Sequence, residues 1–363
     1  MKVVKIKAHR MKTHRFPLLL TILILGSFLL SACTGTVVNT WPGISTAQDT
    51  VYLAFQGEIY AINAGNGALV WRFPSSPDAS KPFYAAPAIS DSLIAAGNYG
   101  HTLYGIDPAS GAQKWAYDSA TGYFAGTPLI VEDVVLAPSS NNWLYAVSAV
   151  DGKLLWKFET GNSLWATPVS DGTNVYVAAL DHNLYALSLE DGSLIWKKDL
   201  GSAMANGALL TEDGTLYVSN LEGEVVALDT DGNVLWTAET EGRIWSTPLL
   251  HEDRLYVGNA ANKVTAISVD DGSIAWQQDA GASIIGGGVI LNGGVAFPTE
   301  AGDLVAWSLD SGTQSWKQPI GGKLYTTPVF AGQTAVVAVT QGDKLLQAVQ
   351  PNGQLSWTFV QPK

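Results

Sequence analysis

The fold is decided by a stretch that recurs along the chain, and residues 167–197 show it clearly: TPVSDGTNVYVAALDHNLYALSLEDGSLIWK. Three turn signals, Asp171-Gly172, Asp181-His182-Asn183 and Asp191-Gly192, divide it into four short runs rich in β-branched and aromatic residues. Gly, Asp and Asn supply the positive φ and the local hydrogen bonds that tight turns require. The stretch therefore predicts four short antiparallel strands.

The tryptophan near the end of this stretch belongs to a series with a nearly constant spacing. Successive members lie 40 to 44 residues apart, and a glycine precedes each of them by four residues. Such periodicity indicates a repeat architecture, in which each unit must stack on its neighbours to bury both of its faces. The eight tryptophans are Trp71, Trp115, Trp156, Trp196, Trp236, Trp276, Trp316 and Trp357.

Eight four-stranded sheets of this size close most economically around a central axis. We therefore expect an all-β, eight-bladed β-propeller of four-stranded antiparallel blades over residues 41–363. No segment after the N-terminal leader keeps an apolar period of 3.6 residues, so helix should be minor there. The Pro- and Ser-rich insertion Pro74–Pro82 accounts for the longest step between tryptophans and should form a surface loop.

Residues 1–32 have the composition of a secretory signal peptide. Six basic residues and no acidic residue precede the apolar run Leu18–Leu30, and either Met1 or Met11 would give a charged start. The run is short for the roughly 20 apolar residues that a membrane-spanning helix needs. We therefore expect export and removal of this segment.

The apolar run ends in Leu30-Ser31-Ala32-Cys33, and Cys33 is the only cysteine of the chain. This arrangement resembles the bacterial lipoprotein signal, which implies that Cys33 is lipidated and that residues 33–40 are a lipidated N-terminus and linker. The alternative is an ordinary cleavage site beside a chance cysteine. A lipid anchor would hold the protein on the cell membrane or the outer membrane, facing the periplasm or the cell exterior.

The expected mature chain is strongly acidic. It keeps 14 Lys and Arg against 32 Asp and Glu, a net charge of −18. A surface of that sign argues against nucleic acid as a partner and against docking on anionic lipid through a basic patch. With a single cysteine there is no disulfide framework, so core packing alone must hold the fold. We expect a monomer with an envelope protein as its partner.

The repeat resembles the tryptophan-docking motif of the pyrroloquinoline-quinone-type eight-bladed propellers. A small residue, a polar residue two positions on, a glycine and a tryptophan four residues later recur, as in Ala146-Val147-Ser148, Gly152 and Trp156. The resemblance covers nearly all of the expected mature chain. It implies that the eight tryptophans pack between neighbouring blades and serve a structural role.

Two branches of that family imply different functions. The quinone-dependent dehydrogenases imply a quinone near the axis, a calcium ion held by oxygen ligands, an aspartate base and commonly a disulfide of adjacent cysteines. One cysteine cannot form that disulfide, and no acidic and amide cluster obviously builds a calcium site. The other branch comprises non-catalytic lipoproteins such as the scaffold subunit of the outer-membrane β-barrel assembly machinery. We therefore expect a protein-binding scaffold without a cofactor; a quinone-dependent enzyme and a carbohydrate-binding propeller are the alternatives.

One departure from the assembly-machinery subunit is visible in the sequence. That subunit contacts its large barrel partner through a loop with an arginine among leucines and through a nearby pair of aspartates. The corresponding segments of this chain, Gly161–Trp165 and Gly201–Ala205, carry neither. The resemblance therefore supports an envelope scaffold more directly than it supports that particular partner.

The candidate binding face is where each outer strand returns to the next inner strand. Most first strands open at a proline such as Pro168, and Asn206-Gly207 and Gly287-Gly288 replace it in two repeats. Counting back three residues gives aromatic residues in four repeats and Met204 in the first of these two. Packing between blades is the alternative role for these aromatics; an exposed patch would mark an interaction site. With Trp143, which follows two asparagines, the candidate set is Tyr84, Trp143, Trp165, Trp245 and Tyr325.

Residues for catalysis or metal binding are sparse. Of the three histidines after the leader, His101 and His182 fall in similar loops on the candidate face, and His251 falls in a turn of the opposite face. None is paired at metal-ligand spacing, so no zinc or iron site is expected. Serine-nucleophile and phosphate-binding motifs are absent from the sequence as well.

Overall fold

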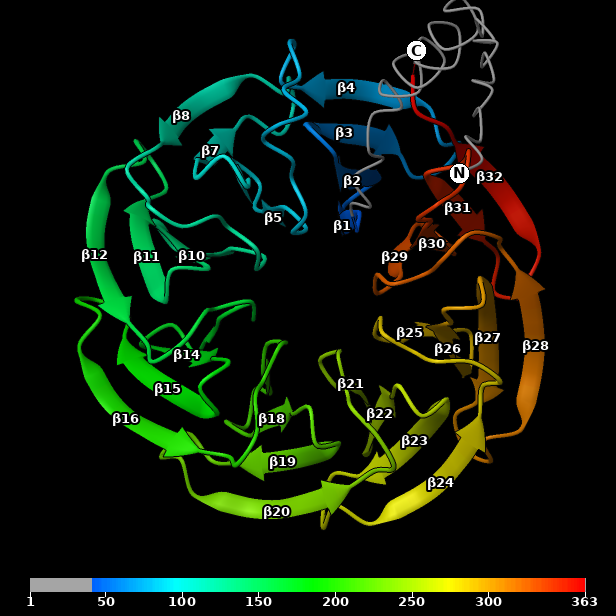
Figure 1. Ribbon diagram of the computed structural model, residues 1–363. Coiled ribbons are helices and arrows are strands. Elements are labelled where there is room, and N and C mark those ends of the chain that lie inside the picture. The colour runs from blue at the N-terminus through cyan, green and yellow to red at the C-terminus, as the bar shows by residue number, and fades with distance from the viewer. Residues whose placement is uncertain (1–40, 363) are drawn as a thin grey trace, which may run out of the picture. The chain divides into compact units, whose positions relative to one another are not determined.

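The computed structural model describes residues 41–362, in which the repeat folds as eight four-stranded antiparallel blades around a central axis (Figure 1). The described residues contain strands and turns and no helix, so the expected all-β propeller is confirmed. The expected signal peptide of residues 1–32, Cys33 and the expected linker lie outside the described residues. Within residues 41–362 no helix meets the length and hydropathy needed to cross a membrane.

Each blade is one continuous stretch of chain whose strands pair in sequence order from the axis outward (Figure 1). The innermost strands are β1 (Gly43–Ala47), β5 (Ala88–Ile89), β9 (Leu129–Val131), β13 (Val169–Ser170), β17 (Leu209–Leu210), β21 (Leu249–His251), β25 (Val289–Leu291) and β29 (Val329–Ala331). The second strands are β2 (Thr50–Phe55), β6 (Ile94–Gly97), β10 (Val134–Pro138), β14 (Asn174–Ala178), β18 (Leu216–Ser219), β22 (Arg254–Gly258), β26 (Gly294–Pro298) and β30 (Thr334–Ala338).

The two outer strands of each blade follow the same order. The third strands are β3 (Glu58–Asn63), β7 (Leu103–Ile106), β11 (Trp143–Ser148), β15 (Asn183–Ser188), β19 (Glu224–Leu228), β23 (Lys263–Ser268), β27 (Asp303–Ser308) and β31 (Leu346–Val349). The outermost strands are β4 (Leu69–Phe73), β8 (Gln113–Tyr117), β12 (Leu154–Glu159), β16 (Leu194–Asp199), β20 (Val234–Glu239), β24 (Ile274–Asp279), β28 (Gln314–Pro319) and β32 (Leu355–Phe359).

The recurrent tryptophan of each outermost strand lies against the next blade. Trp156 shows the geometry: its Nε1 donates a hydrogen bond to the carbonyl of Leu189, at 3.0 Å, and its ring lies over Gly192. A Cβ added to Gly192 would come within 2.4 Å of the indole, and this glycine has a φ of 71°. Both facts require glycine there. The carbonyls that accept from the eight indoles belong, in chain order, to Pro108, Ala149, Leu189, Thr230, Val269, Leu309, Pro351 and Ala64.

A β-bulge in each outermost strand sets the direction of its docking tryptophan. In blade 4, Ala186 pairs with Trp196 but Leu187 pairs with Leu194, so Ile195 is an extra residue in the outer strand. Such a bulge bends its strand and changes the direction of the neighbouring side chains. The residue paired with the tryptophan is small; at Gly105 an added Cβ would lie 2.2 Å from Trp115. Bulge and small partner together explain the spacing of the sequence motif.

The buried apolar side chains of the described chain form eight clusters, one between each pair of neighbouring blades. Blade 4 and blade 5, for example, share a cluster that contains Tyr176, Met204 and Val218, none of them accessible to solvent. Each interface thus buries a separate small core, and burial of apolar surface is the main favourable contribution to folding.

The ring closes between blade 8 and blade 1 without exchange of a strand. Trp357 donates to the carbonyl of Ala64 at 2.8 Å, which repeats the contact made at the other seven junctions. The Thr326 hydroxyl donates to the carbonyl of Pro42 at 2.6 Å, and the Gln361 side-chain amide donates to the Tyr60 hydroxyl at 3.3 Å. Side-chain docking therefore closes the circle.

Candidate functional site

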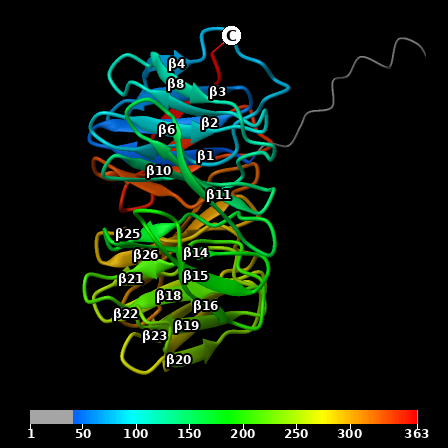
Figure 2. The ribbon, with the colours of Figure 1, turned by 90° about the vertical axis from the view of Figure 1, so that its left-hand side faces the viewer.

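The strand order gives the propeller two chemically different faces, seen edge-on in Figure 2. The connection face carries the blade-to-blade connections and the turns between second and third strands. The turn face carries the turns between first and second strands and between third and fourth strands. Because every blade has the same topology, equivalent positions of all eight blades gather at one level of one face.

A ring of equivalent positions surrounds the axis on the connection face. In blade 4, Val169 of the innermost strand pairs with Tyr176, and Trp165 lies four residues before Val169. The same count from the corresponding pair gives one position in each blade, which we call the axial ring. Its members are Trp41, Tyr84, Ala125, Trp165, Ala205, Trp245, Ile285 and Tyr325.

The aromatic members of the axial ring remain accessible to solvent. Trp41 and Trp165 expose 49% and 42% of their surface, and Tyr84, Trp245 and Tyr325 are half-buried. Across the junction of blades 8 and 1, Trp41 stacks on Tyr325 with the ring centroids 5.1 Å apart. Exposed tryptophan at one level of a symmetric surface is typical of interaction sites. The ring therefore offers apolar area that the fold itself leaves uncovered.

Between blades 2 and 3, Tyr99 and Tyr123 extend the axial ring from its member Tyr84. The ring centroids of Tyr84 and Tyr99 are 4.1 Å apart, and those of Tyr99 and Tyr123 are 4.2 Å apart. Burial, and then the neighbouring Tyr123 and Tyr84, raise the pKa of Tyr99 to about 12. Burial also raises the pKa of Tyr84. Tyr84 and Tyr99 therefore stay neutral at physiological pH and present hydroxyl groups together with apolar ring surface.

The structure corrects the sequence-based account of this ring at two positions. Met204 is not a member: strand pairing places Ala205 in the ring, whereas Met204 is fully buried between blades 4 and 5. Trp41 is a member that the sequence reasoning missed. A usable signal existed, because Trp41 precedes Tyr52 by eleven residues just as Trp165 precedes Tyr176. Counting from the second strand would have found it.

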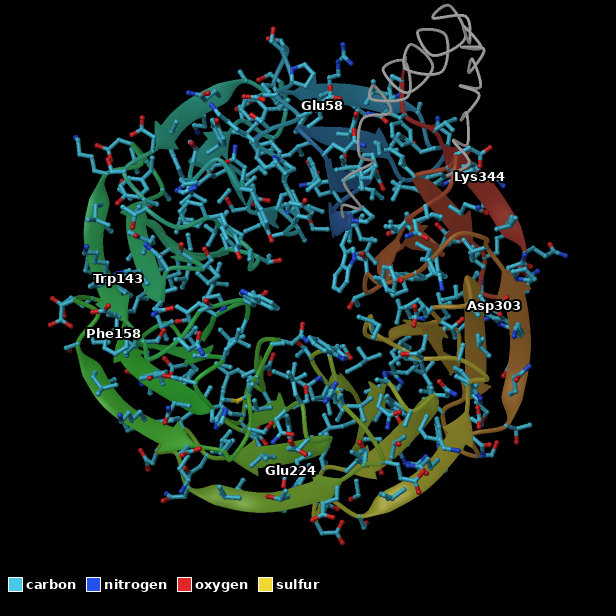
Figure 3. The ribbon with its side chains drawn as sticks, viewed as in Figure 1. Glu58, Trp143, Phe158, Glu224, Asp303 and Lys344 are labelled. Atoms are coloured by element: carbon cyan, nitrogen blue, oxygen red, sulfur yellow. The ribbon has the colours of Figure 1, made fainter. Side chains whose placement is uncertain are left out.

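Trp143 belongs to the same face but not to the axial ring. It is the first residue of β11, the third strand of blade 3, and Figure 3 places it near the circumference beside Phe158. The Lys157 ammonium lies 4.1 Å from the centroid of its ring, a cation–π contact. The structure thus brings four of the five candidate residues around the axis and leaves Trp143 apart from them.

The polar residues of the second-to-third turns mainly build those turns. The buried side chain of Asn98 accepts a hydrogen bond from the backbone N–H of Thr102 at 3.0 Å, and Asn259 accepts one from Lys263 in the same way. His101 and His182 are exposed and have positive φ values of 66° and 73°. Their recurrence follows from the geometry of a two-strand turn and does not by itself indicate a shared ligand.

Acidic residues are concentrated on the turn face. Of the 32 carboxylates of the chain, 18 lie in its loops, and the one lysine in those loops is Lys153. Lys114 and Arg254 reach this face from the strands and donate to backbone carbonyls there. The 18 carboxylates are Asp49, Asp91, Asp107, Glu132, Asp133, Asp151, Asp171, Glu190, Asp191, Glu212, Asp213, Asp229, Asp231, Glu252, Asp253, Asp270, Asp271 and Asp310.

The connection face has a far more even balance of charge. Its loops contain seven carboxylates and four cations. Seven further carboxylates end strands on this side, and three of them make ion pairs, among them Asp303 with Lys317 at 2.8 Å. At the axial ring, Glu300 accepts a hydrogen bond from the Tyr325 hydroxyl at 3.2 Å and pairs with Lys323 at 3.4 Å. The field of the molecule is therefore asymmetric between the two faces.

The residues around the axis do not match the donor set of a quinone and calcium site. Such a site needs several oxygen ligands converging on one point. Within residues 41–362 no group of three or more His, Cys, Asp or Glu side chains is placed to hold a metal ion. The adjacent cysteines implied by the dehydrogenase branch are excluded by the sequence. We therefore assign no reaction step to a quinone.

A cleft of about 250 Å³ lies on the turn face between blades 6 and 7. His251, Glu252 and Asp310 are among its lining residues, which confirms that His251 faces away from the other two histidines. Arg254 Nη1 donates to the carbonyls of Leu309 and Asp310, at 3.0 and 3.2 Å. These contacts direct the guanidinium to the protein's own backbone, and the cleft walls include the carboxylates of Glu252, Asp253 and Asp310.

Comparison with known proteins finds one matching family and several solved structures with a similar fold. The family described as outer membrane protein assembly factor BamB matches residues 55–209, 180–289 and 282–363. The crystal structure of BamB from Moraxella catarrhalis is similar, with a TM-score of 0.70 at 17% identity over 85% of this chain and 93% of that one. A computationally designed protein, Ika8, has a TM-score of 0.71 at 11% identity over 88% of this chain and 97% of that one. No curated protein matches the sequence. At these identities the structures establish the fold alone.

Proposed function

This chain belongs to the family of the outer membrane protein assembly factor BamB, and we propose that it is a non-catalytic scaffold of the cell envelope, anchored by a lipid on Cys33. It binds a protein partner through the connection face. A role in the assembly of outer-membrane proteins is the more specific form of this proposal. The family match and the lipoprotein-type leader support it.

The observation that carries the binding role is the exposure of the axial ring. Trp165 is not one of the eight docking tryptophans, belongs to none of the eight core clusters, and leaves 42% of its surface in water. Large aromatic side chains dominate the energetics of protein interfaces because they bury much apolar area at a small cost in conformational entropy. The half-buried Tyr84, Trp245 and Tyr325 extend this apolar surface around the axis.

Site-specific photo-crosslinking tests the scaffold proposal. A benzophenone amino acid is placed at Trp165 on the connection face and, as a matched control, at the exposed Thr173 on the turn face. After irradiation of intact envelopes, we expect a protein adduct from position 165 and none from position 173. Identical adducts from both positions, or retention of polysaccharide alone at 165, would contradict protein binding by this face.

The enzyme alternative has its own test. Purified protein is mixed with pyrroloquinoline quinone and calcium, and its absorbance and dye-linked alcohol oxidation are recorded. We expect neither stoichiometric uptake nor turnover, because residues 41–362 contain no group of three or more His, Cys, Asp or Glu side chains placed to hold a metal ion. Stoichiometric uptake with turnover would replace the scaffold proposal with that of a quinone-dependent dehydrogenase.

A further inference from the structure

The geometry points to an orientation for this protein: we propose that the connection face rests on the lipid surface that holds the anchor and that the turn face points away from it. The inference rests on the proposed lipidation of Cys33. It adds to the scaffold proposal that lipid covers the axial ring when no protein does, so a partner meets the ring at the membrane surface. Four observations carry it.

The first observation is where the tether joins the propeller. Trp41, the first described residue, is a member of the axial ring and lies two residues before β1. It stacks on Tyr325 of blade 8, and the neighbouring Pro42 accepts a hydrogen bond from Thr326. The chain that leads to Cys33 therefore leaves from the connection face, close to the axis, and not from the circumference.

The second observation is the length of that chain. Eight Cα–Cα steps separate Cys33 from Trp41, and eight residues span about 29 Å at most. To lay the turn face on the lipid by way of the circumference, the tether would have to pass three strand spacings outward, about 14 Å, and then run along the length of a strand. A strand of five or six residues is about 17–20 Å long. This outer path exceeds the reach of the tether, so the tether could bring the turn face to the lipid only by running along the axis. The connection face needs no such detour.

The third observation is the distribution of charge. The loops of the turn face hold 18 carboxylates against one lysine. The connection side has seven carboxylates against four cations in its loops and seven more carboxylates at strand ends, three of them in ion pairs. Cytoplasmic and envelope lipid surfaces that carry anionic headgroups repel carboxylates within a Debye length, about 8 Å at physiological ionic strength. If the connection face rests on the lipid, the 18 carboxylates of the turn face lie about one strand length away, which is beyond that range.

The fourth observation is the chemistry of the axial ring. Tryptophan and tyrosine are enriched at membrane–water interfaces, where an apolar ring and a polar N–H or O–H group are both satisfied. Trp41 and Trp165 are the exposed aromatics of the ring. A short tether holds them near the lipid at an effective concentration of the order of millimolar, so even a weak contact is populated. Tether, charge and aromatic side chains therefore favour one orientation.

The test uses the anchored chain on vesicles of phosphatidylcholine. Once mass spectrometry has verified lipidation, the only native thiol is blocked, so a polarity-sensitive dye can be attached to a single introduced cysteine. Asn162→Cys places it near Trp165 on the connection face, and Thr173→Cys places it on the turn face; both residues are exposed. We expect the dye at 162 to shift to the blue and brighten on vesicles, and the dye at 173 to stay unchanged. Equal shifts, or a shift at 173 alone, would overturn the orientation.

Alanine variants then separate lipid contact from mere proximity. Trp41→Ala with Trp165→Ala should abolish the blue shift at position 162. Leu155→Ala removes an equally exposed apolar side chain from outer strand β12 and should leave the shift intact. A shift that survives the double change overturns lipid contact by the ring. Because these vesicles hold no other protein, a negative result here beside a protein adduct at 165 in envelopes would leave the scaffold proposal standing.

Discussion

Blade 4 carries one tryptophan toward each side of the disc, and the two have opposite fates. Trp196 reaches toward the turn face, where its Nε1 donates to the carbonyl of Thr230 at 2.8 Å and its ring covers Gly232. Trp165 stands on the connection face with 42% of its surface exposed. The difference shows that residue type alone does not separate structure from function. Position relative to the blade junction does.

The same division holds for charge. On the turn face, aspartates such as Asp191 and Asp271 accept hydrogen bonds from the backbone of their own turns, which ties the acidic residues to local structure. On the connection face, carboxylates such as Glu300 and Asp303 face lysines. These turn-face carboxylates are therefore bound to the backbone of their turns, whereas these connection-face carboxylates are paired with cations.

The largest expected effect concerns the docking tryptophan. Trp196→Ala should lower the free energy of unfolding by about 3–5 kcal/mol, because it removes a large ring from a blade junction and leaves a cavity. Urea denaturation followed by circular dichroism measures the change. A loss below about 1 kcal/mol would show that blade docking does not depend on the indole.

A glycine pair sharpens the comparison between faces. Gly192→Ala should cost about 1–3 kcal/mol, because the new Cβ would meet the Trp156 ring at 2.4 Å in addition to the penalty of a positive φ. Gly201 on the connection face has a φ of 80° but nothing within 4 Å of such a Cβ. Gly201→Ala should therefore cost only about 1 kcal/mol, the backbone penalty alone. Equal thermal shifts for the two variants would contradict this account.

Removal of an exposed ring residue should cost little. Trp165→Ala should change the free energy of unfolding by less than about 1 kcal/mol, because 42% of the residue's surface is accessible and it belongs to none of the core clusters. The same urea titration used for Trp196→Ala provides the measurement. A large loss of stability would assign Trp165 to the packing of blades 3 and 4 and remove it from the candidate binding surface.

The smallest expected effect is a pH dependence carried by the turn face. Burial alone would raise the pKa of Asp171, but hydrogen bonds from the backbone of Asn174 and Thr173 and from the Tyr176 hydroxyl outweigh it, and the pKa is lowered. A lowered folded-state pKa means that the stabilisation is present above the unfolded value, near 3.9, and is lost as the pH falls through the folded value. Urea midpoints measured from pH 6 to pH 3 should decline.

Asp171→Asn provides the control for that titration. The variant keeps the shape of the side chain but cannot be protonated, so its decline toward low pH should be shallower than that of the parent chain. Parallel curves for the two proteins would show that other groups carry the acid sensitivity.

The sequence predicts the eight-bladed propeller well because each repeat unit contains the residues of one blade-docking contact. The glycine, the small residue and the tryptophan of each unit are fixed by one docking contact, so their spacing reports blade number and strand order. The axial ring is harder to predict, because no motif marks its position in every blade. Blades 1, 5 and 7 have no proline at the start of the first strand. In blade 5, strand pairing puts Ala208 where blade 4 has Pro168, so a count of three residues back from Gly207 reaches Met204 instead of Ala205.

Trp41 and Trp143 show a second limit. Trp41 stands at the start of the first blade, where no proline marks the first strand, so its equivalence with Trp165 appears only in a count back from the second strand, which strand pairing confirms. Trp143 lies on the same face as the axial ring, but it belongs to the third strand of its blade, which is far from the axis (Figure 3). Knowing which turn a residue belongs to does not tell how far it lies from the axis. Distance from the axis had to come from the sheet order.

The absence of strand exchange at the junction of blades 8 and 1 has a genetic consequence. Each blade is encoded as one uninterrupted segment of about 40 residues, and all eight junctions are closed by the same indole-to-carbonyl bond. New termini could thus be opened in any blade-to-blade connection, and the old ones joined, without dividing a sheet. Duplication or loss of one segment would change the circumference by a whole wedge, which offers evolution a simple route between rings of different size.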